Sequence, residues 1–340
     1  MTKQYNVAVV GATGMVGQKM IDVLLERKFP VNSFKLLASA RSADKKVVIG
    51  SETYTIEELK PASFEGIDFA FFSAGGDISK EMAPEAVKHG AIVIDNSSAF
   101  RMDKDVPLVV PEVNPGAVHR HQGIIANPNC STIQMVVALQ PLHAAVPMKR
   151  VVAATYQAVS GAGREAVEEL QEQCLSYLDG KPVKTERFPQ YGAKRNYQMA
   201  FNLVPQIDVF MEDGYCKEEI KMVNETRKIM NLPDLPVTST TVRVPVLNSH
   251  SIAVNLELQE ELTAGKAREL LQKAPGVVVL DDPGSLLYPT PLEADGSDAV
   301  YVGRIRPDNS VRYGLNLWVV SDNIRKGAAT NSIQIAELLI

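Results

Sequence analysis

The sequence is poor in cysteine, and no two of its cysteines lie close together. Cys130, Cys174 and Cys216 are the only three in 340 residues, and they form no CxxC motif. An odd number of distant cysteines argues against a disulfide framework and against a structural zinc site. The same pattern suits a reducing compartment, so we expect the protein to work in the cytoplasm.

Long apolar runs and an excess of positive charge are also missing. No stretch approaches the roughly 18 apolar residues that a transmembrane helix needs. The N-terminal run MTKQYNVAVVGATG stops at a glycine turn and lacks the charged start and cleavage site of a signal peptide. The formal net charge is -5, so no basic field favours nucleic acid or an anionic membrane. We therefore expect neither nucleic acid nor a membrane as a partner.

The first part of the chain alternates short apolar runs with helical patterns. Hydrophobic residues make up 45% and charged residues 22%, which is enough apolar material for two buried cores. Alternating strands and helices predict a parallel sheet with right-handed crossovers. The predicted strands are Tyr5–Val10, Phe34–Ala38, Ile67–Ser73, Ala91–Ile94 and Gly123–Ala126, and the predicted helices are Met15–Arg27 and Ser79–His89.

After Cys130 the pattern changes to longer strands. This predicts a second, α+β domain with a largely antiparallel or mixed sheet. The predicted strands are Arg150–Val159, Val237–Val246, Ser251–Leu258, Val277–Leu280, Val300–Arg306 and Val311–Val320. The predicted helices are Ser131–Leu139, Arg164–Leu178, Lys217–Met230 and, at the end of the chain, Ile324–Ile340. Segment 181–205 has weak periodicity and receives no assignment.

A glycine-rich turn follows the first predicted strand and opens the first helix. Its sequence is Gly11-Ala12-Thr13-Gly14-Met15-Val16-Gly17. Glycine lets the backbone turn tightly and approach a pyrophosphate, whose charge is favoured at a helix N-terminus. The GxxGxxG spacing is a variant of the GxGxxG dinucleotide fingerprint. Its place between a strand and a helix favours nucleotide binding over a turn without a ligand.

The end of the second predicted strand indicates which nucleotide is bound. A site for NAD usually places an Asp or Glu about 20 residues after the glycines. Here the strand ends in Ala38-Ser39-Ala40-Arg41-Ser42, and Asp44 lies further out. Serine hydroxyls and an arginine suit a 2′-phosphate, which favours NADP(H). The alternative is that Arg41 is an ordinary solvated charge.

Cys130 lies between a predicted apolar strand and the start of an apolar helix, behind the turn Asn127-Pro128-Asn129. Backbone N–H groups and the helix dipole at that position stabilise a thiolate. The same N–H groups can stabilise an oxyanion when a carbonyl is attacked. A cysteine is more often a small buried hydrophobic residue, but this position favours a nucleophile. Cys174 and Cys216 are interpreted as structural.

A nucleophilic cysteine needs an acid or a base beside it, and five histidines compete for that role. His143 lies 13 residues along the same helical stretch, about 20 Å away at 1.5 Å per residue, which excludes it. His89 ends a helix of the nucleotide domain. His119 and His121 lie in a polar loop without further metal ligands nearby, so no metal site is expected. His250 lies between two apolar strands, and spacing alone ranks it first or second.

The strongest blocks of the sequence are Gly11–Gly17, Ser97–Arg101, Asn127–Cys130, Thr155–Gly163, Glu218–Lys221, Arg243–His250 and Ser321–Asn323. In this order, they resemble the aspartate-β-semialdehyde dehydrogenase family over essentially the whole chain. The short lengths between blocks are similar to those of the bacterial branch typical of Gram-positives. The family reduces L-aspartyl 4-phosphate with NADPH to aspartate semialdehyde, a step toward lysine (through diaminopimelate), methionine and threonine.

The resemblance implies a division of the chain into two domains. Residues 1–129, completed by a C-terminal helix at 323–340, would form a Rossmann-like NADP-binding domain. Residues 130–322 would form an α+β catalytic and dimerisation domain of the glyceraldehyde-3-phosphate dehydrogenase-like type. A homodimer through this second domain, or a dimer of dimers, is expected.

The resemblance also implies roles for individual residues. Cys130 would be the acyl-enzyme nucleophile, His250 the acid–base catalyst, and Gln157 the residue that orients the substrate and thioester. The substrate would be bound by Arg101 and Lys221 at its phosphate, Arg243 at its α-carboxylate and Glu218 at its α-ammonium, together with Asn129. Cofactor contacts would come from Gly11, Thr13, Gly14, Met15, Val16, Ser39, Arg41, Ser42, Ser160, Gly161 and Asn323.

Three other functions compete with this one. An N-acetyl-γ-glutamyl-phosphate reductase uses similar chemistry, but its substrate has no free amine, so Glu218 would lack an ammonium partner. Glyceraldehyde-3-phosphate dehydrogenase has a different sequence context around the cysteine. A non-catalytic NADPH-binding sensor would bind the cofactor without phosphate-dependent turnover.

Overall fold

The chain divides into two compact units. A computed structural model describes residues 3–340. The first unit comprises Met1–Asn129 together with Ala328–Ile340, and the second comprises Cys130–Gly327. Cys130 is therefore the first residue of the second unit, and the chain returns to the first unit only near its end.

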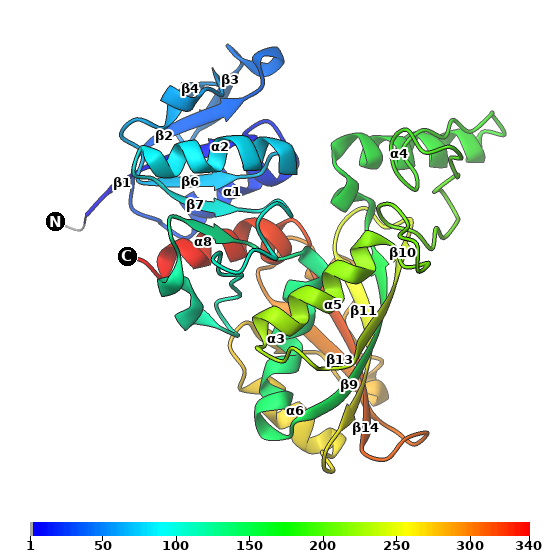
Figure 1. Cartoon of the computed structure of the whole chain (residues 1–340). Coiled ribbons are helices and arrows are strands. Elements are labelled where there is room, and N and C mark those ends of the chain that lie inside the picture. Colours follow the sequence, from blue (N-terminus) through cyan, green and yellow to red (C-terminus); the bar gives the residue numbers. More distant parts are fainter. Residues whose placement is uncertain (1–2) are drawn as a thin grey trace. The chain divides into compact units, whose positions relative to one another are not determined.

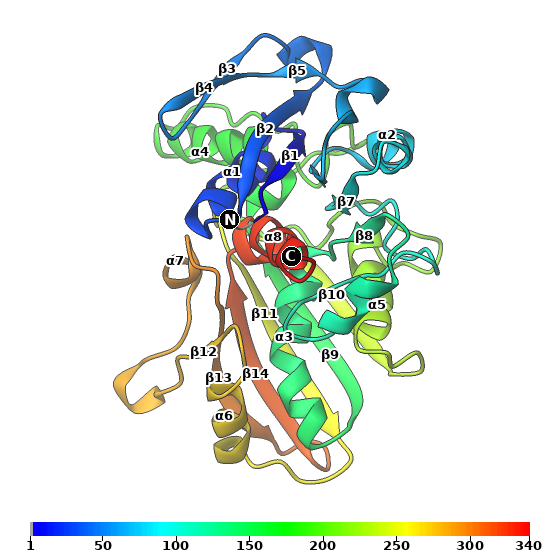
Figure 2. The same ribbon diagram turned by 90° about the vertical axis from the view of Figure 1, so that its left-hand side faces the viewer.

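The first unit is built on a six-stranded sheet in which all paired strands are parallel. The strand order is β5-β2-β1-β6-β7-β8, of which Figure 1 labels β2, β1, β6 and β7 and Figure 2 labels β5 and β8. The bounds are β1 Tyr5–Val10, β2 Val31–Ala38, β5 Glu57–Glu58, β6 Phe69–Phe72, β7 Ile92–Asp95 and β8 Ile124–Ala126. The continuous apolar runs of β1 and β6 suit parallel strands that are covered on both faces. The predicted parallel α/β sheet is confirmed.

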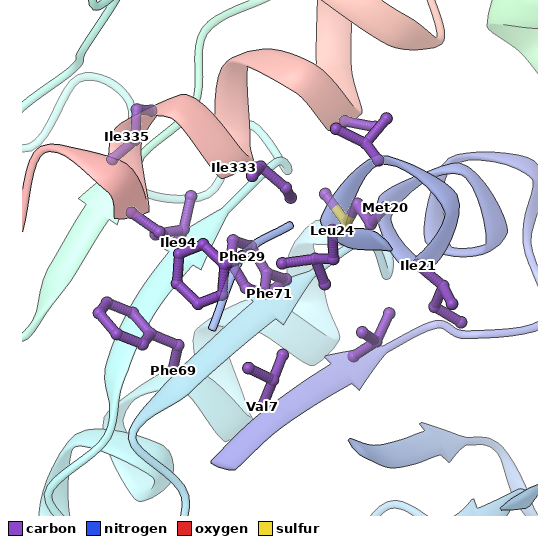
Figure 3. Close-up of a cluster of buried hydrophobic side chains, with 14 of the residues drawn as sticks. Val7, Met20, Ile21, Leu24, Phe29, Phe69, Phe71, Ile94, Ile333 and Ile335 are labelled. Carbon is purple, nitrogen blue, oxygen red and sulfur yellow. The ribbon is translucent and has the colours of Figure 1, made fainter. Parts of the chain in front are cut away.

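Hydrophobic clusters cover the two faces of this sheet. Phe71 points to one face, where the cluster includes residues of α1 (Met15–Glu26) and α8 (Thr330–Glu337), as Figure 3 shows. Its neighbour Phe72 points to the other face, where residues of α2 (Gly76–Lys88) pack. Successive residues of a strand point to opposite faces, so one apolar strand serves both clusters. The C-terminal segment thus completes the core of the first unit.

A small hairpin in the first unit was not predicted. It pairs β3 (Lys46–Ile49) with β4 (Glu52–Thr55), and the short edge strand β5 follows it. The apolar run of β3 is only three residues long, and β4 and β5 are mainly polar, so none of them shows the longer apolar pattern on which the prediction rested. The turn is possible because Gly50 has a φ of 61°, a value that suits glycine.

The return to the first unit begins later than the sequence suggested. The expected helix over 323–340 is replaced by a π-helix, Arg325–Ala329, followed by α8, and the change of unit falls at Ala328. Asn323 stays with the second unit because its side chain is bonded there. Its Oδ1 accepts from the Ser249 N–H at 2.9 Å, and its Nδ2 donates to the Ser160 hydroxyl at 3.0 Å.

The second unit contains a mixed six-stranded sheet of order β10-β9-β11-β14-β13-β12 (Figure 2). The inner pairs are antiparallel, whereas β10 pairs with β9 and β12 pairs with β13 in parallel. The bounds are β9 Met148–Gln157, β10 Val237–Arg243, β11 His250–Leu258, β12 Val277–Val279, β13 Val300–Asp308 and β14 Gly314–Ser321. The expected α+β domain is confirmed, with the mixed form of the sheet.

The helices of the second unit include two short ones, α6 and α7, that were not predicted. The bounds are α3 Cys130–Ala145, α4 Arg164–Leu178, α5 Lys217–Ile229, α6 Ala264–Gln272 and α7 Pro291–Ala294. The unpredicted α6 is short, and the Thr263 hydroxyl caps its N-terminus by accepting from the Lys266 N–H at 3.2 Å. Short 3₁₀ helices lie at Ala40–Ser42, Pro61–Phe64, Pro115–Arg120, Val159–Ala162 and Pro283–Ser285. Within residues 3–340, no helix combines the length and the apolar character needed to cross a bilayer.

The unassigned segment 181–205 has no helix or strand, and side chains tie it to α4. Phe188, Met199 and Val204 pack against apolar residues of α4 in a separate cluster. The buried amide of Gln173 accepts from two backbone N–H groups of the segment, and Glu169 accepts from two more. Hydrogen bonds from side chains replace a regular ladder here, which is why the sequence shows no period.

Candidate active site

The glycine turn of the first unit leaves no room for side chains. Gly11 has a φ of 84°, and a Cβ there would lie 2.4 Å from the Ser73 carbonyl oxygen. A Cβ on Gly17 would lie 2.2 Å from the Gly11 carbonyl oxygen. Gly14 is the exposed N-cap of α1 without a side-chain cap, and the first turn of that helix holds no acid. The turn therefore offers backbone N–H groups and a positive dipole end, which suit a pyrophosphate.

The residues expected at a 2′-phosphate lie just after β2. Ser39 and Arg41 are exposed, and Arg41 and Ser42 belong to the 3₁₀ helix Ala40–Ser42. Among residues 3–340, no hydrogen bond or ion pair engages the Arg41 guanidinium. The group is therefore available to a ligand.

Cys130 is the first residue of α3 and is half-buried. The rest of this helix is almost wholly buried as far as Leu139, so its N-terminus is held rigidly. On one side the thiol residue packs against glycine, since a Cβ on Gly327 would lie 2.8 Å from the Cβ of Cys130. That glycine belongs to the π-helix, a feature frequently found at functional sites.

Three strand ends bring candidate residues together at one edge of the second sheet. Gln157 ends β9, and Arg243, which is opposite it in the register, ends β10. His250 begins β11, which runs antiparallel to β9, so it lies at the same edge. All three side chains are at least nine-tenths buried. The register of the sheet therefore groups side chains that are far apart in the sequence.

His250 is neutral in this environment. Burial and the charge of Arg243 lower the pKa of its imidazole to about 3, although Glu218 opposes the shift. The Ala158 N–H donates to Nδ1 at 3.0 Å, so Nδ1 is an acceptor and the proton of the neutral ring lies on Nε2. That Nε2 is buried and has no partner among the described residues. His250 is therefore a hydrogen-bond donor that awaits an acceptor.

Arg243 is a buried cation beside the nucleophile. One guanidinium nitrogen donates to the Ala158 carbonyl at 2.7 Å, and its Nε is buried without a partner among the described residues. Burial lowers the pKa of the guanidinium, whereas the charges of Glu218 and Cys130 oppose that shift. The guanidinium thus interacts electrostatically with the sulfur and retains free donor capacity for an anion.

Gly161 keeps space open in front of both of these groups. A Cβ at this position would lie 3.0 Å from a terminal nitrogen of Arg243 and 3.3 Å from Nε2 of His250. Its neighbour Ser160 bonds to Asn248 at 2.9 Å and to Asn323, which fixes the loop before β11. Ser160, Gly161 and Asn323 therefore lie around the catalytic candidates of the second unit.

The first turn of α5 adds a chain of polar side chains. Gln157 donates to Glu218 at 3.1 Å, and Glu218 accepts from Lys221 at 3.2 Å. Lys221 also donates to Asp208 at 3.0 Å. Burial alone would lower the pKa of Lys221, but the two carboxylates outweigh it and the pKa is raised. The expected i, i+3 pair is therefore present, with a third member that the sequence did not suggest.

The structure does not place every candidate in the second unit. Arg101 and Asn129 belong to the first unit with the glycine turn and Arg41. Arg101 is buried and donates to the backbone carbonyls of Asn127 and Asn96, each at 2.9 Å. Sequence reasoning missed Asp208 and Gly327, since Asp208 follows an unassigned segment and Gly327 lies in what was expected to be an ordinary helix.

Two family models match the chain. Residues 6–121 match the semialdehyde dehydrogenase NAD binding domain, and residues 139–326 match the semialdehyde dehydrogenase dimerisation domain. The parallel sheet with its glycine turn and the second α+β unit agree with this pair. The class of protein is therefore a semialdehyde dehydrogenase, a nicotinamide-dependent oxidoreductase with a dimerisation domain.

Individual relatives narrow this class. Aspartate-semialdehyde dehydrogenase of Bacillus subtilis is 54% identical over 340 residues, which is 100% of this chain and 98% of the relative. The structure of aspartate semialdehyde dehydrogenase II from Vibrio cholerae, complexed with ASA, has a TM-score of 0.95 and 48% identity over 99% of this chain and 98% of that one. The Candida albicans enzyme, solved with NADP, has a TM-score of 0.76 and 26% identity over 99% and 98% of the two chains. The chain belongs to the aspartate-semialdehyde dehydrogenase family.

Proposed function

We propose that the protein catalyses the NADPH-dependent reductive dephosphorylation of L-aspartyl 4-phosphate to aspartate 4-semialdehyde through a thioester on Cys130. The observation that carries the proposal is the position of Cys130 at the start of α3, in the electrostatic reach of the buried Arg243. Family membership supplies the reaction, which lies in the aspartate pathway of amino-acid biosynthesis.

Cys130 acts as the nucleophile in this proposal. Its thiolate attacks the acyl carbon, and the carbonyl oxygen becomes an oxyanion stabilised by backbone N–H groups at the start of α3. The bond between the acyl carbon and the phosphate oxygen then breaks. Inorganic phosphate departs, and the acyl group remains on Cys130 as a thioester. When bound, NADPH supplies the hydride that reduces this thioester. Cleavage of the carbon–sulfur bond finally releases the aldehyde and restores the thiolate.

His250 is the acid–base catalyst of the proposal. Its proton lies on Nε2, so in this arrangement the ring can donate to an oxygen that gains negative charge. It does not remove the thiol proton in the same arrangement, because Nδ1 is occupied by the Ala158 N–H. The dipole of α3 and the charge of Arg243 are then what favour the thiolate.

Charged groups of the second unit suit the two ends of the amino-acid substrate. Arg243 has free donors for the α-carboxylate, and the Glu218 carboxylate suits the α-ammonium. Lys221 can bind the phosphate as a point charge. Gln157 holds Glu218 and thereby helps to orient the substrate. From the first unit we assign Arg101 to the phosphate and Asn129 to the substrate.

The glycine turn and the residues after β2 fit NADP(H). We assign the pyrophosphate to the turn from Gly11 through Thr13, Gly14 and Met15 to Val16, and the 2′-phosphate to Ser39, Arg41 and Ser42. We assign Ser160, Gly161 and Asn323 to the nicotinamide end. The support is the crowding around Gly11 and Gly17, the uncapped N-terminus of α1, and the availability of Arg41.

The substitution Arg41→Ala is expected to weaken NADP binding by about tenfold or more, since a charge-assisted contact to the 2′-phosphate is lost. NAD has no such phosphate, so its affinity should change little. Titration of protein fluorescence with each nucleotide measures both effects. Lys45→Ala removes another exposed charge from the same loop and serves as the control. Equal losses of affinity for NADP and NAD would show that Arg41 does not bind the 2′-phosphate.

The reaction is tested in the reverse direction, following NADPH formation at 340 nm with NADP and phosphate present. Phosphate-dependent turnover of aspartate semialdehyde, but not of N-acetylglutamate semialdehyde, is the expected result. A preference for the second aldehyde would support the N-acetyl-γ-glutamyl-phosphate reductase alternative, which the family does not favour. Binding of NADPH with no turnover of either aldehyde would support a non-catalytic sensor.

We infer that the working form is a homodimer made by the second unit, and that it acts in the cytoplasm. The dimerisation-domain match supports the first inference, and the three free cysteines suit a reducing compartment. Sedimentation equilibrium separates a dimer from a dimer of dimers.

A further inference from the structure

Lys221 is shared between two carboxylates, only one of which has a role in the proposed reaction. Its ammonium lies 3.2 Å from an oxygen of Glu218 and 3.0 Å from an oxygen of Asp208. The side chain of Glu218 is 6% exposed, whereas that of Asp208 is 34% exposed. A single lysine therefore compensates a buried carboxylate and one nearer the surface.

The backbone holds Asp208 in place. Its φ is 68°, and its Oδ1 accepts from the Val209 N–H at 2.8 Å, which leaves Oδ2 for Lys221. The carbonyl of Asp208 accepts from the side chain of Gln206 at 3.1 Å. Asp and Asn tolerate this left-handed conformation better than most residues. The carboxylate is therefore presented to Lys221 by a built local structure.

Asp208 changes the charge that a substrate meets. Lys221 is coupled to Glu218 and Asp208, and Arg243 is coupled to Glu218 and to Cys130. Cys130 apart, the formal charges of these four residues sum to zero. Without Asp208, Lys221 would pair with Glu218 alone, and the group would carry one net positive charge. A Glu218 carboxylate whose charge is fully compensated by Lys221 attracts the substrate ammonium weakly, because the ammonium must compete with a cation that is already bonded.

We propose that Asp208 is the positioning residue that keeps Glu218 available to the substrate ammonium, by drawing part of the Lys221 charge away from it. The inference rests on the proposed function and extends it to substrate specificity. Removal of the Asp208 charge affects the two substrates of the reverse reaction in opposite directions. Discrimination in favour of the amine falls, whereas affinity for phosphate rises, because Lys221 and Arg243 are no longer balanced.

The test is Asp208→Asn, assayed in the phosphorylating direction with aspartate semialdehyde and with succinate semialdehyde, which lacks only the amine. Asparagine keeps the left-handed backbone and an acceptor for Val209, so it removes the charge and little else. We expect the ratio of kcat/KM for the two aldehydes to fall about tenfold, and KM for phosphate to fall. Asp213→Asn is the matched control, since this exposed residue makes a similar local bond to Tyr215.

A substitution that only damages the structure would lower kcat/KM for both aldehydes alike and would not lower KM for phosphate. An unchanged aldehyde ratio in a folded, active Asp208→Asn protein overturns the inference. In a Glu218→Gln background, Asp208→Asn should have no further effect on the ratio, and an undiminished effect there would also overturn it. The wild-type protein distinguishes failure of the proposed role of Asp208 from failure of the proposed function. If wild-type protein did not turn over aspartate semialdehyde, the proposed function itself would be refuted.

Discussion

Cys130→Ser is expected to lower turnover of aspartate semialdehyde by at least about 10⁴-fold, because serine has no accessible anion at neutral pH in place of the thiolate. The substitution is nearly isosteric, and it leaves the close approach of Gly327 to the Cβ of Cys130 unchanged. Binding of NADPH should therefore be unchanged. The rate is measured at 340 nm, and NADPH binding is measured by fluorescence titration.

Cys174→Ser is the matched control for this experiment. Cys174 is half-buried on α4 and packs against an apolar cluster, and no role in the proposed reaction is assigned to it. Its substitution should leave kcat within about twofold. Substantial turnover by the Cys130→Ser protein would contradict the thioester mechanism. Wild-type protein is mixed with the acyl phosphate and the reaction is then quenched. Mass spectrometry should show the acyl adduct on the peptide that contains Cys130.

His250→Asn is expected to lower kcat by about 10²- to 10⁴-fold, the usual range for loss of a positioned acid–base group. The asparagine Oδ1 can accept from the Ala158 N–H as Nδ1 does, so the loop conformation should survive. The substitution removes the buried Nε2–H, which has no acceptor among residues 3–340. The variant should still form the acyl adduct, because the thiolate is stabilised by α3 and Arg243.

His143→Asn provides the comparison, because the Nδ1 of His143 also accepts a backbone N–H, that of Met148, at 3.2 Å. This histidine lies in the last turn of α3, and its replacement should leave kcat nearly unchanged. If His250→Asn lost adduct formation as well as turnover, His250 would act as the base for the thiol. The tautomer inferred from the Ala158 contact would then be wrong for the reacting state.

Much of the first unit followed from the pattern of apolar residues. Strand Tyr5–Val10 has the same bounds in the structure as in the prediction, because its continuous apolar run is bounded by a glycine turn. The strands from β3 to β5 were not predicted because β3 has an apolar run of only three residues and β4 and β5 are short and mainly polar. Helix α6 was missed for a related reason, since its apolar stripe is brief. Burial leaves a pattern in the sequence, whereas short edge elements leave almost none.

The candidate site divides in the same way. Cys130 was recognised because a helix start leaves a local signal, and Gly11 because a tight turn does. Spacing could not choose His250 from the other histidines. Its selection depends on the antiparallel pairing of β11 with β9, which brings it to the edge where Gln157 and Arg243 end their strands.

The sequence alone therefore predicted the local chemical features. These are a glycine turn for a nucleotide, a cysteine at a helix start, and an acid and a lysine one helical turn apart. The tertiary arrangement added the properties that depend on distant neighbours. Burial beside Arg243 makes His250 neutral, and the Ala158 N–H sets the position of its proton. Asp208 joins Lys221 through a bond across 13 positions. Electrostatic energies depend on distance through space and on burial, and neither is encoded in sequence spacing.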